Sequence, residues 1–367
     1  MSVILRVDGQ YFGGWQSVRI NRGIEQIAGT FDLTVTDRWN AGDVQQALEL
    51  AAGQSCEVLV NDSVVITGFI DSVKRQYDKQ SHAITITGRD KTGDLVDCSA
   101  IFKSGQWSNK TVAQIARDLL KPFAIGVIVA TDVGAPLPTF AIQEGASVFE
   151  ELERAAKMRA LILMSDGAGN LLITRASKTP AAAQLLEGDN ILKADGEFSW
   201  MDRFSQYLIK GQSKGSDNVF GEAVAQQSAL VKDSGINRYR PLLIVADEQG
   251  GGATLKQRAE WERNVRFGRG TRATMTVQGW DVGGQLWQPN TLARVVSPLL
   301  SADLDLLIVS VAFSLDEGGH LTTLQLTLPQ AFDTIENVKQ TRLEKKIRKA
   351  QGDESGITDN EWTLPRD

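Results

Sequence analysis

Apolar and polar positions alternate along the first hundred residues with the period of two that a half-buried β-strand produces. The clearest run is 31–36, which reads Phe-Asp-Leu-Thr-Val-Thr. Further apolar runs of strand length follow the same logic: 3–7, 56–60, 64–73 and 83–87. Gly-rich and polar turns separate these runs, for example at 13–14 and 78–80. Residues 1–100 are therefore predicted to form a first small β-barrel.

Residues 101–180 change to the helical period. Two capping boxes, in which a Ser or Thr and a Glu or Gln three residues later satisfy each other's backbone N–H groups, open helices: Thr111 with Gln114, and Ser147 with Glu150. Apolar positions then recur three and four residues apart. The short apolar runs 161–164 and 171–174 flank a polar turn and predict a β-hairpin. This part of the chain is expected to be an α+β module.

Residues 181–330 return to strand patterns, and one segment interrupts them. We predict a second, discontinuous β-barrel from residues 181–214 and 270–330, with strands at 205–210 and 273–277. Residues 215–269 are predicted to be a flexible and helical insertion, because 215–252 is polar and Gly-rich. Residues 331–367 are expected to be a polar C-terminal tail without a packed face.

The helix of the insertion is predicted at 254–267. Arg258, Glu262 and Arg266 are spaced four residues apart, as ion pairs along one helix face require. The apolar stripe is weak, so this helix is expected to be a surface element available for protein contact.

The two strand-rich regions resemble each other in order and spacing. The matches are 33–39 with 275–280, 53–58 with 289–295, and the hairpin 66–73 and 83–87 with the hairpin 307–315 and 321–328. With a duplicated domain, a ring of three chains contains six similar domains at near-equivalent positions. The expected fold class is therefore α+β and mostly β: two related small β-barrels, an α+β module and a helical insertion.

The amino-acid composition argues against some classes of function. The chain carries 39 basic and 45 acidic residues, a net charge of −6, with a pI of about 5.2. This balance argues against sequence-specific nucleic-acid binding, which needs a basic footprint. No apolar stretch approaches the ~20 residues that cross a bilayer, so no stable membrane insertion is expected. The start of the chain has charges that a signal peptide lacks, and Cys56 and Cys98 are expected to be buried thiols in a reducing cytoplasm.

The candidates for catalysis are weak. Gly211–Gly215 matches the G-x-S-x-G nucleophile elbow with Ser213 at its centre, and His320 lies downstream. That motif requires a following helix, and turn residues follow here. The chain's other histidine, His82, and His320 each lie at the turn end of a predicted hairpin, where a solvated loop histidine is expected. No catalytic, cofactor-binding or metal-binding residue is predicted.

Paired carboxylates are likewise expected to be solvated surface charge. Glu150 and Glu151 lie on the predicted helix, and Asp303 and Asp305 lie in an apparent loop. Glycosidase chemistry needs two acids that flank a cleft at a defined separation. The turn at 166–170 has too few oxygen ligands for a calcium loop. Eight tryptophans are expected to be core or interface anchors: Trp15, Trp39, Trp107, Trp200, Trp261, Trp280, Trp287 and Trp362.

A family resemblance starts from residues 278–292, which read Gln-Gly-Trp-Asp-Val-Gly-Gly-Gln-Leu-Trp-Gln-Pro-Asn-Thr-Leu. This segment is similar to the Trp-turn-Leu-Trp-x-Pro-Asn motif of Mu-like baseplate hub proteins of contractile phage tails, a family also labelled late control gene D. The motif residues are Trp280, Trp287, Pro289 and Asn290, and a structural role is expected for them. The opening of the chain and the module around 146–175 also resemble that family.

The resemblance implies a structural protein without enzymatic activity. Hubs of this family are homotrimers whose two barrels per chain make a pseudo-sixfold ring between the hexameric tail tube and the trimeric central spike. The implied partners are further copies of this chain, the spike protein, tail tube or tape-measure proteins and other baseplate proteins. The implied location is the virion tail baseplate, assembled in the host cytoplasm.

Three alternatives stay open at this point. The hub of a tail-like bacteriocin or of a type VI secretion spike belongs to the same class. A tail-associated cell-wall hydrolase would be an enzyme, and the missing catalytic constellation counts against it. A transcriptional regulator would fit the late control label but conflicts with the acidic pI.

Overall fold

The computed structural model describes residues 2–36, 50–77, 82–157, 159, 161–211, 228–246 and 255–332. Within these residues the chain forms two compact units. The larger unit contains residues 2–199 and 267–332, and the smaller unit contains residues 200–266.

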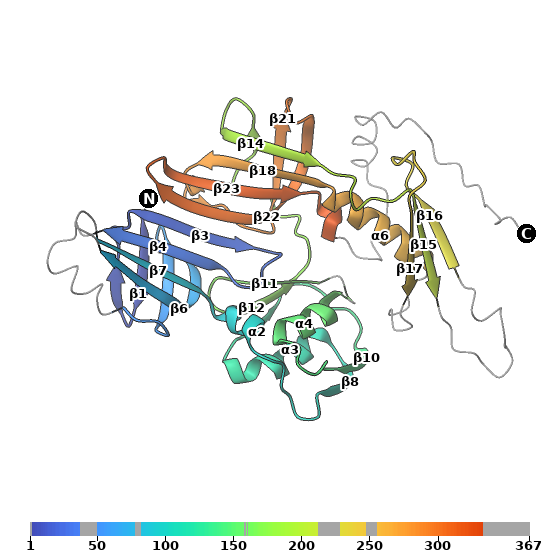
Figure 1. The fold of residues 1–367 in the computed structure, drawn as a ribbon, viewed down its shortest axis with the longest axis horizontal. Coiled ribbons are helices and arrows are strands. Elements are labelled where there is room, and N and C mark those ends of the chain that lie inside the picture. The colour runs from blue at the N-terminus through green and yellow to red at the C-terminus, as the bar shows by residue number, and fades with distance from the viewer. Residues whose placement is uncertain are drawn as a thin grey trace, which may run out of the picture. The chain divides into compact units, whose positions relative to one another are not determined.

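Thirteen of the described strands of the larger unit form one sheet (Figure 1). Its first half contains β1 (Val3–Val7), β2 (Gln10–Phe12), β3 (Ser17–Gly23), β4 (Thr30–Thr36), β5 (Ser55–Val60), β6 (Ser63–Tyr77) and β7 (His82–Asp90). Its second half contains β13 (Leu185–Leu186), β14 (Ile191–Phe198), β18 (Thr271–Gln278), β21 (Leu292–Ser297), β22 (Ala302–Asp316) and β23 (Gly319–Thr327). A 3-10 turn, η3 (Pro329–Phe332), follows β23.

The two halves have the same strand order. The first runs β3-β4-β7-β6-β5, and the second runs β14-β18-β23-β22, with β21 paired to the start of β22. The register also repeats, because Thr34 lies opposite Thr85 in the first half and Thr276 lies opposite Thr323 in the second. In both pairs the hydroxyl oxygens lie at hydrogen-bond distance, 3.1 Å and 3.3 Å. The strand order and register agree with the predicted internal repeat, and Thr34 and Thr276 lie at matching positions.

The halves meet along one strand pair. Ser310–Leu315 of β22 pairs antiparallel with Val18–Gly23 of β3. No pairing among the described strands closes either half into a ring, so the predicted barrels stay a prediction. Alternation tells which face of a strand is buried, and it does not tell whether a sheet closes.

Apolar side chains on one face of each half make the core. In the first half they include Leu5, Ile20, Leu33, Val58 and Ile66, and in the second Met275, Val295, Leu307, Phe313 and Leu324. Burying one such side chain stabilises the fold by about 1.5–3 kcal/mol. This gain explains why the alternating runs of the sequence become strands.

The α+β module follows β7. It contains η1 (Lys91–Gly93), α2 (Asp94–Asp97), β8 (Gln106–Lys110), α3 (Val112–Leu120), η2 (Lys121–Phe123), β9 (Val127–Val129), β10 (Leu137–Ala141), α4 (Val148–Lys157), β11 (Ile162–Ser165) and β12 (Leu171–Thr174). Both predicted capping boxes are present, at Thr111 with Gln114 and at Ser147 with Glu150. The apolar faces of α3 and α4 are buried against one another and against β11 and β12. The predicted hairpin is β11 and β12.

The smaller unit differs from the predicted organisation. Its strands are β15 (Gln206–Gly211), β16 (Ser228–Lys232) and β17 (Pro241–Ala246), and its helix is α6 (Leu255–Arg269), which runs on into the larger unit. We assigned 205–210 to the second barrel, but β15 pairs with β16 and β17. Part of the predicted flexible segment 215–252 is therefore sheet. The cause is the core of this unit, where Tyr207, Ile209, Val231 and Ala259 pack together.

Candidate functional site

The two motif tryptophans flank a short hairpin. Its strands are β19 (Asp281–Val282) and β20 (Gln285–Leu286), and the Gly283-Gly284 turn between them has positive φ at both residues. Trp280 has no exposed surface and donates its indole N–H to the Ser314 carbonyl oxygen at 3.0 Å. Trp287 is also buried. The tryptophans are therefore anchors of the second half of the sheet.

His320 packs against this hairpin. Its ring meets Trp280 edge-on, with ring centroids 4.5 Å apart and planes at 75°. It was predicted to be a solvated loop histidine, and it is instead half-buried at the start of β23. A histidine next to a turn can still pack, because the neighbouring strand β18 leads into Trp280 and places its ring beside His320.

Asn290 holds three backbone segments together. Its φ is +60°, a left-handed conformation that asparagine tolerates better than most residues. Its N–H donates to the Ile308 carbonyl at 2.8 Å. Its side-chain oxygen accepts from the Ser177 N–H at 2.9 Å, and its side-chain amide donates to the Arg175 carbonyl at 3.0 Å. Asn290, beside the buried Pro289, thus fixes the chain that leaves the α+β module onto β22.

The motif also contacts the first half of the sheet. The Gln288 side-chain oxygen accepts from the Arg22 guanidinium of β3 at 3.0 Å. The Asp281 carboxylate accepts from the Asn61 side-chain amide, in the turn between β5 and β6, at 2.5 Å. We call residues 280–290 with these contacts the tryptophan junction. It joins both halves of the sheet and the α+β module.

A buried polar cluster lies where the first half meets the α+β module. The Ser165 hydroxyl donates to the Asp90 carboxylate at 2.6 Å, and the Thr92 N–H donates to the same carboxylate at 3.3 Å. Burial raises the pKa of Asp90, and these hydrogen bonds and the Arg22 charge offset part of that rise. Burial lowers the pKa of the Arg22 guanidinium. Such a cluster fixes the relative position of two elements, because each polar group needs its partner.

The acidic residues that the sequence places in pairs differ in their burial and in the elements that carry them. Glu151 is 1% exposed, where solvated charge was predicted. Its carboxylate accepts from the Gln143 N–H at 2.7 Å and pairs with Arg154, which compensates its burial. Asp303 and Asp305 are exposed but lie in β22, where a loop was predicted.

The charged residues of α6 form the pairs that their spacing predicts. The Glu262 carboxylate lies 2.9 Å from the Arg258 guanidinium and 3.3 Å from that of Arg266. Glu262 is buried, while both arginines keep part of their surface exposed. Ala259 of the same helix packs into the core of the smaller unit.

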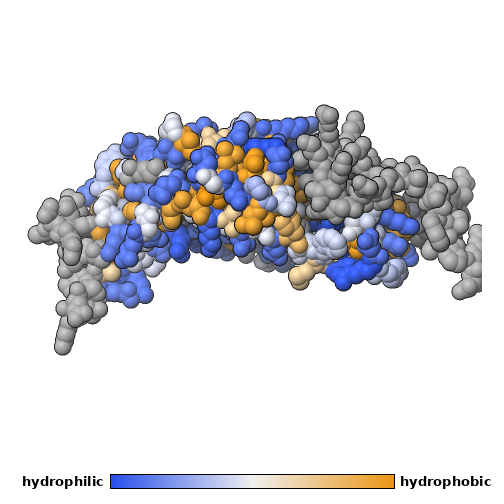
Figure 2. Space-filling model, turned by 90° about the horizontal axis from the view of Figure 1, so that it is seen from above, coloured by the Kyte–Doolittle hydropathy of each residue, from blue (hydrophilic) through white to orange (hydrophobic). Residues whose placement is uncertain are grey.

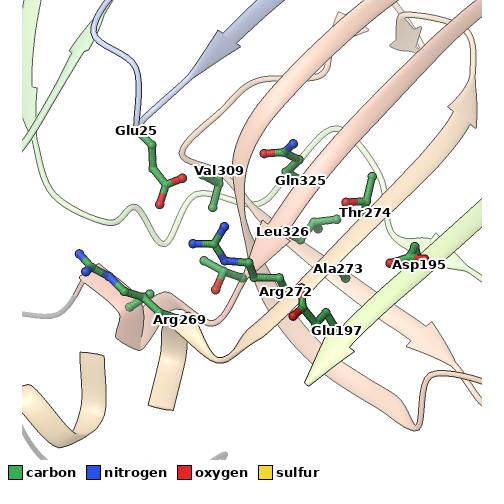
Figure 3. Close-up of a pocket in the computed structure, with 12 residues that line it drawn as sticks. Glu25, Asp195, Glu197, Arg269, Arg272, Ala273, Thr274, Val309, Gln325 and Leu326 are labelled. Atoms are coloured by element: carbon green, nitrogen blue, oxygen red, sulfur yellow. The ribbon is translucent and has the colours of Figure 1, made fainter. Parts of the chain in front are cut away.

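A charged hollow of about 230 Å³ lies beside β14, β18 and β23 (Figure 3). Charged side chains from several elements line it: Glu25, Asp195, Glu197, Arg269 and Arg272. The Thr327 hydroxyl in its wall lies within hydrogen-bond distance of the backbone oxygens of Gly268 and Thr271, at 3.0 Å and 2.8 Å. Among the residues that line it, we find no nucleophile paired with a base.

Several candidates from the sequence have no structural description. Ser213, Trp39 and Trp362 lie outside the described residues. His82 opens β7 opposite Tyr77, as His320 lies opposite Leu315 in the other half. Across the described part of the chain, no three His, Cys, Asp or Glu side chains come together as a metal site. Of the described helices, none has the length and apolar character to span a membrane.

The two cysteines have different environments, although both were predicted to be buried. Cys56 is 3% exposed in β5, and Cys98 is exposed after α2. Burial, with smaller contributions from the charges of Asp71 and Asp90, raises the pKa of the Cys56 thiol to about 12. Cys98 was misplaced because α2 is too short to produce a helical pattern in the sequence.

We expect a thiol reagent at pH 8 to modify one cysteine per folded chain and both after denaturation. The thiolate is the reactive form, and Cys56 holds it only far above this pH. Mass spectrometry after labelling with a disulfide reagent would locate the modified residue. Rapid modification of Cys56 in a folded Cys98→Ser variant would contradict this assignment.

Comparison with protein families places matches on three parts of the chain. Residues 2–90 match the Mu phage baseplate assembly protein GpP-like N-terminal family, and residues 92–175 match the second domain of the baseplate hub protein gp44-like family. Residues 251–335 match the fourth domain of the Mu phage baseplate assembly protein GpP family.

Relatives cover almost the whole chain. The baseplate hub protein gp44 of Escherichia phage Mu is 34% identical over 366 residues, which span 97% of this chain and 94% of that protein. The 43 kDa tail protein of prophage MuSo2 from Shewanella oneidensis is 40% identical, with a TM-score of 0.80, over 91% of this chain and 99% of that one. A tail protein from Neisseria meningitidis MC58 is 26% identical, with a TM-score of 0.77, over 90% and 98% of the two chains.

Proposed function

Because this chain belongs to the family of Mu-like phage baseplate hub proteins, we propose that it forms a homotrimeric ring that joins the tail tube to the central spike. It is a structural protein of the tail baseplate, and so a part of the virion. In the proposed ring, each chain contributes both halves of its sheet, which gives three-fold symmetry and six near-equivalent positions.

The observation that carries this proposal is the repeated strand order β3-β4-β7-β6-β5 and β14-β18-β23-β22-β21 within one sheet. A ring of three such chains offers six similar surfaces to a six-fold tube and three identical surfaces to a three-fold spike. A single chain can thus match two partners of different symmetry.

The proposed mechanism is adhesion between folded surfaces, without turnover. The tryptophan junction supports it, since buried anchors and backbone clamps keep the two halves rigid with respect to each other. We propose the spike protein, tail tube or tape-measure proteins and other baseplate proteins as partners. The charged face of α6 is a candidate contact surface for one of them, and assembly takes place in the host cytoplasm.

Light scattering tests the ring directly. We expect the purified chain to have three times the monomer mass of 40.0 kDa, or, once mixed with its spike protein, to form a complex that contains three copies of the chain. A monomeric mass at high micromolar concentration, both alone and with the spike protein, would contradict the proposed ring.

A further inference from the structure

The three-stranded sheet of the smaller unit has a different environment on each of its two faces. On one face, residues of the strands and of α6 pack together: Tyr207, Ile209, Val231, Leu255 and Ala259. Successive side chains of a strand point to opposite faces, so the residues between these lie on the side of the sheet away from α6. Figure 1 shows the three strands side by side, with α6 next to them.

The strand register places nine residues on the face away from α6, in three rows. The middle row contains three leucines, Leu230, Leu208 and Leu243, which lie opposite one another in β16, β15 and β17. The outer rows are Lys232, Gln206 and Pro241 on one side and Ser228, Lys210 and Val245 on the other. We call these nine residues the open face.

The open face is more apolar than a sheet surface in contact with water usually is, because strands normally present polar side chains there. Leu230, Leu243 and Val245 are 45%, 54% and 58% exposed. Figure 2 shows hydrophobic residues among hydrophilic ones at the surface of the smaller unit, on the right of that view. Adjoining apolar side chains that stay exposed mark a site of interaction with another molecule.

The charges of the open face have one sign. Lys210 and Lys232 are exposed on either side of the leucine row, and none of the nine residues is acidic. Arg238, in the loop that leads into Pro241, is also exposed. Such a surface is complementary to one that carries apolar groups between negative charges.

The size of the open face matches one α-helix. Three strands spaced about 4.8 Å apart form a strip roughly 10–14 Å wide, and a helix with its side chains is about 10–12 Å in diameter. β15 and β17 have six residues each, so at about 3.3 Å per residue they extend for roughly 20 Å. A helix of about 13 residues has that length. The opposite face of the same sheet already packs against one helix, α6.

The described helices of this chain already bury their apolar faces elsewhere. The apolar faces of α3 and α4 lie in the core of the α+β module. In α6, Leu255 and Ala259 contact the covered face of the sheet. A helix that fits the open face therefore belongs to another protein.

We propose that the open face binds one amphipathic helix of another baseplate protein. Three to four turns of this helix place apolar side chains on the leucine row, and acidic side chains beside them face Lys210 and Lys232. The inference rests on the proposed function, because it assumes that the chain is part of a baseplate. It adds a contact surface outside the proposed ring and the chemistry of the partner that this surface recognises.

Photocrosslinking in assembled particles identifies what covers the open face. Leu243 is replaced by the photoreactive residue p-benzoylphenylalanine, the particles are irradiated, and the linked peptides are sequenced by mass spectrometry. We expect a peptide of a different protein, with apolar residues three and four positions apart and a net negative charge. A link only to this chain or to a second copy, a linked peptide without that pattern and charge, or no link at all overturns the proposal.

Leu299 is the matched control for the crosslinking. It is an apolar residue that is 82% exposed, and it lies in the larger unit. The same photoreactive residue at position 299 should give at most about a tenth of the peptide found from position 243, because crosslinking requires direct contact across the interface. Equal yields from the two positions would show that the peptide does not bind the open face.

Charge reversal gives an independent measurement. Lys210→Glu should lower the yield of infectious particles about tenfold or more when the variant complements a phage that lacks its own hub, since it places like charges opposite each other. Lys210→Arg keeps the positive charge and should preserve the yield.

Light scattering on the Lys210→Glu chain separates this site from the ring. We expect the variant to have the same mass as the original chain, because the open face lies outside the proposed ring contact. A loss of trimers in the variant alone, or a normal particle yield with Lys210→Glu, overturns the docking site and leaves the proposed function standing. Failure of the original chain to form trimers, alone and with the spike protein, contradicts the proposed ring, while the crosslinked peptide still decides the docking site.

Discussion

Trp280→Ala is expected to lower the free energy of unfolding of the larger unit by about 3–5 kcal/mol, the usual cost of removing a fully buried tryptophan. The side chain has no exposed surface and meets the His320 ring edge-on. Its removal leaves a cavity in the tryptophan junction. It also leaves the Ser314 carbonyl without its indole donor.

Denaturant unfolding followed by circular dichroism measures this effect. Val282→Ala is the matched control, because Val282 lies in the same hairpin and is 41% exposed. It should change stability by less than about 0.5 kcal/mol. Equal unfolding midpoints for the two variants would show that the hairpin does not anchor the second half of the sheet.

Asp233→Ala is expected to destabilise the smaller unit by about 3–5 kcal/mol, since it breaks a buried ion pair and leaves the opposite charge behind. The Asp233 carboxylate accepts from the Arg203 guanidinium at 3.0–3.1 Å and from the Gly235 N–H at 3.0 Å. Both charged side chains are almost completely buried.

Hydrogen exchange separates this local effect from global unfolding. Protection should fall in β15, β16 and β17 and persist in the strands of the larger unit. Asp202→Ala is the control, because Asp202 is exposed and next to Arg203 in the sequence. Loss of protection throughout the larger unit would mean that the two units unfold together.

The sequence predicted an element most accurately where neighbouring residues alone determine its local structure. Alternation placed β1, β4, β5 and β7 close to their observed ends, and the capping boxes placed the starts of α3 and α4. The repeat was recognisable because Leu33-Thr34-Val35 and Met275-Thr276-Val277 have the same pattern of burial. The strand ends, the helix starts and the repeat can be predicted because each depends on residues that are close together in the sequence.

The sequence was least informative where a partner decides the structure. β14 was missed because its residues, Ile-Leu-Lys-Ala-Asp-Gly-Glu-Phe, form an edge strand whose apolar side chains remain mostly exposed. β15 was given to the wrong sheet, since its alternation fits any sheet with one buried face. The burial of Glu151 could not be seen, because its compensating hydrogen bond comes from Gln143 in a preceding loop.

The candidate site was predictable in its residues and not in its role. The motif around Trp280 and Asn290 was singled out, and its tryptophans were expected to pack. That Asn290 clamps the connection at Arg175 and Ser177 required the structure. The positive φ at Asn290 leaves only a weak signal in the sequence, an asparagine after a proline.

The pairing of β3 with β22 has a consequence for synthesis on the ribosome. The N-terminal half emerges first, and β3 must wait for a strand encoded near the other end of the message. At about 5–20 residues per second, that delay is roughly 15–60 s. During this delay the outer edge of β3 has unpaired backbone groups, and we expect the charges of Arg19 and Arg22 to disfavour pairing with unrelated strands. The final strand pair is therefore a late folding event, and a ribosome-stalled chain that ends before β22 should need a chaperone to stay soluble.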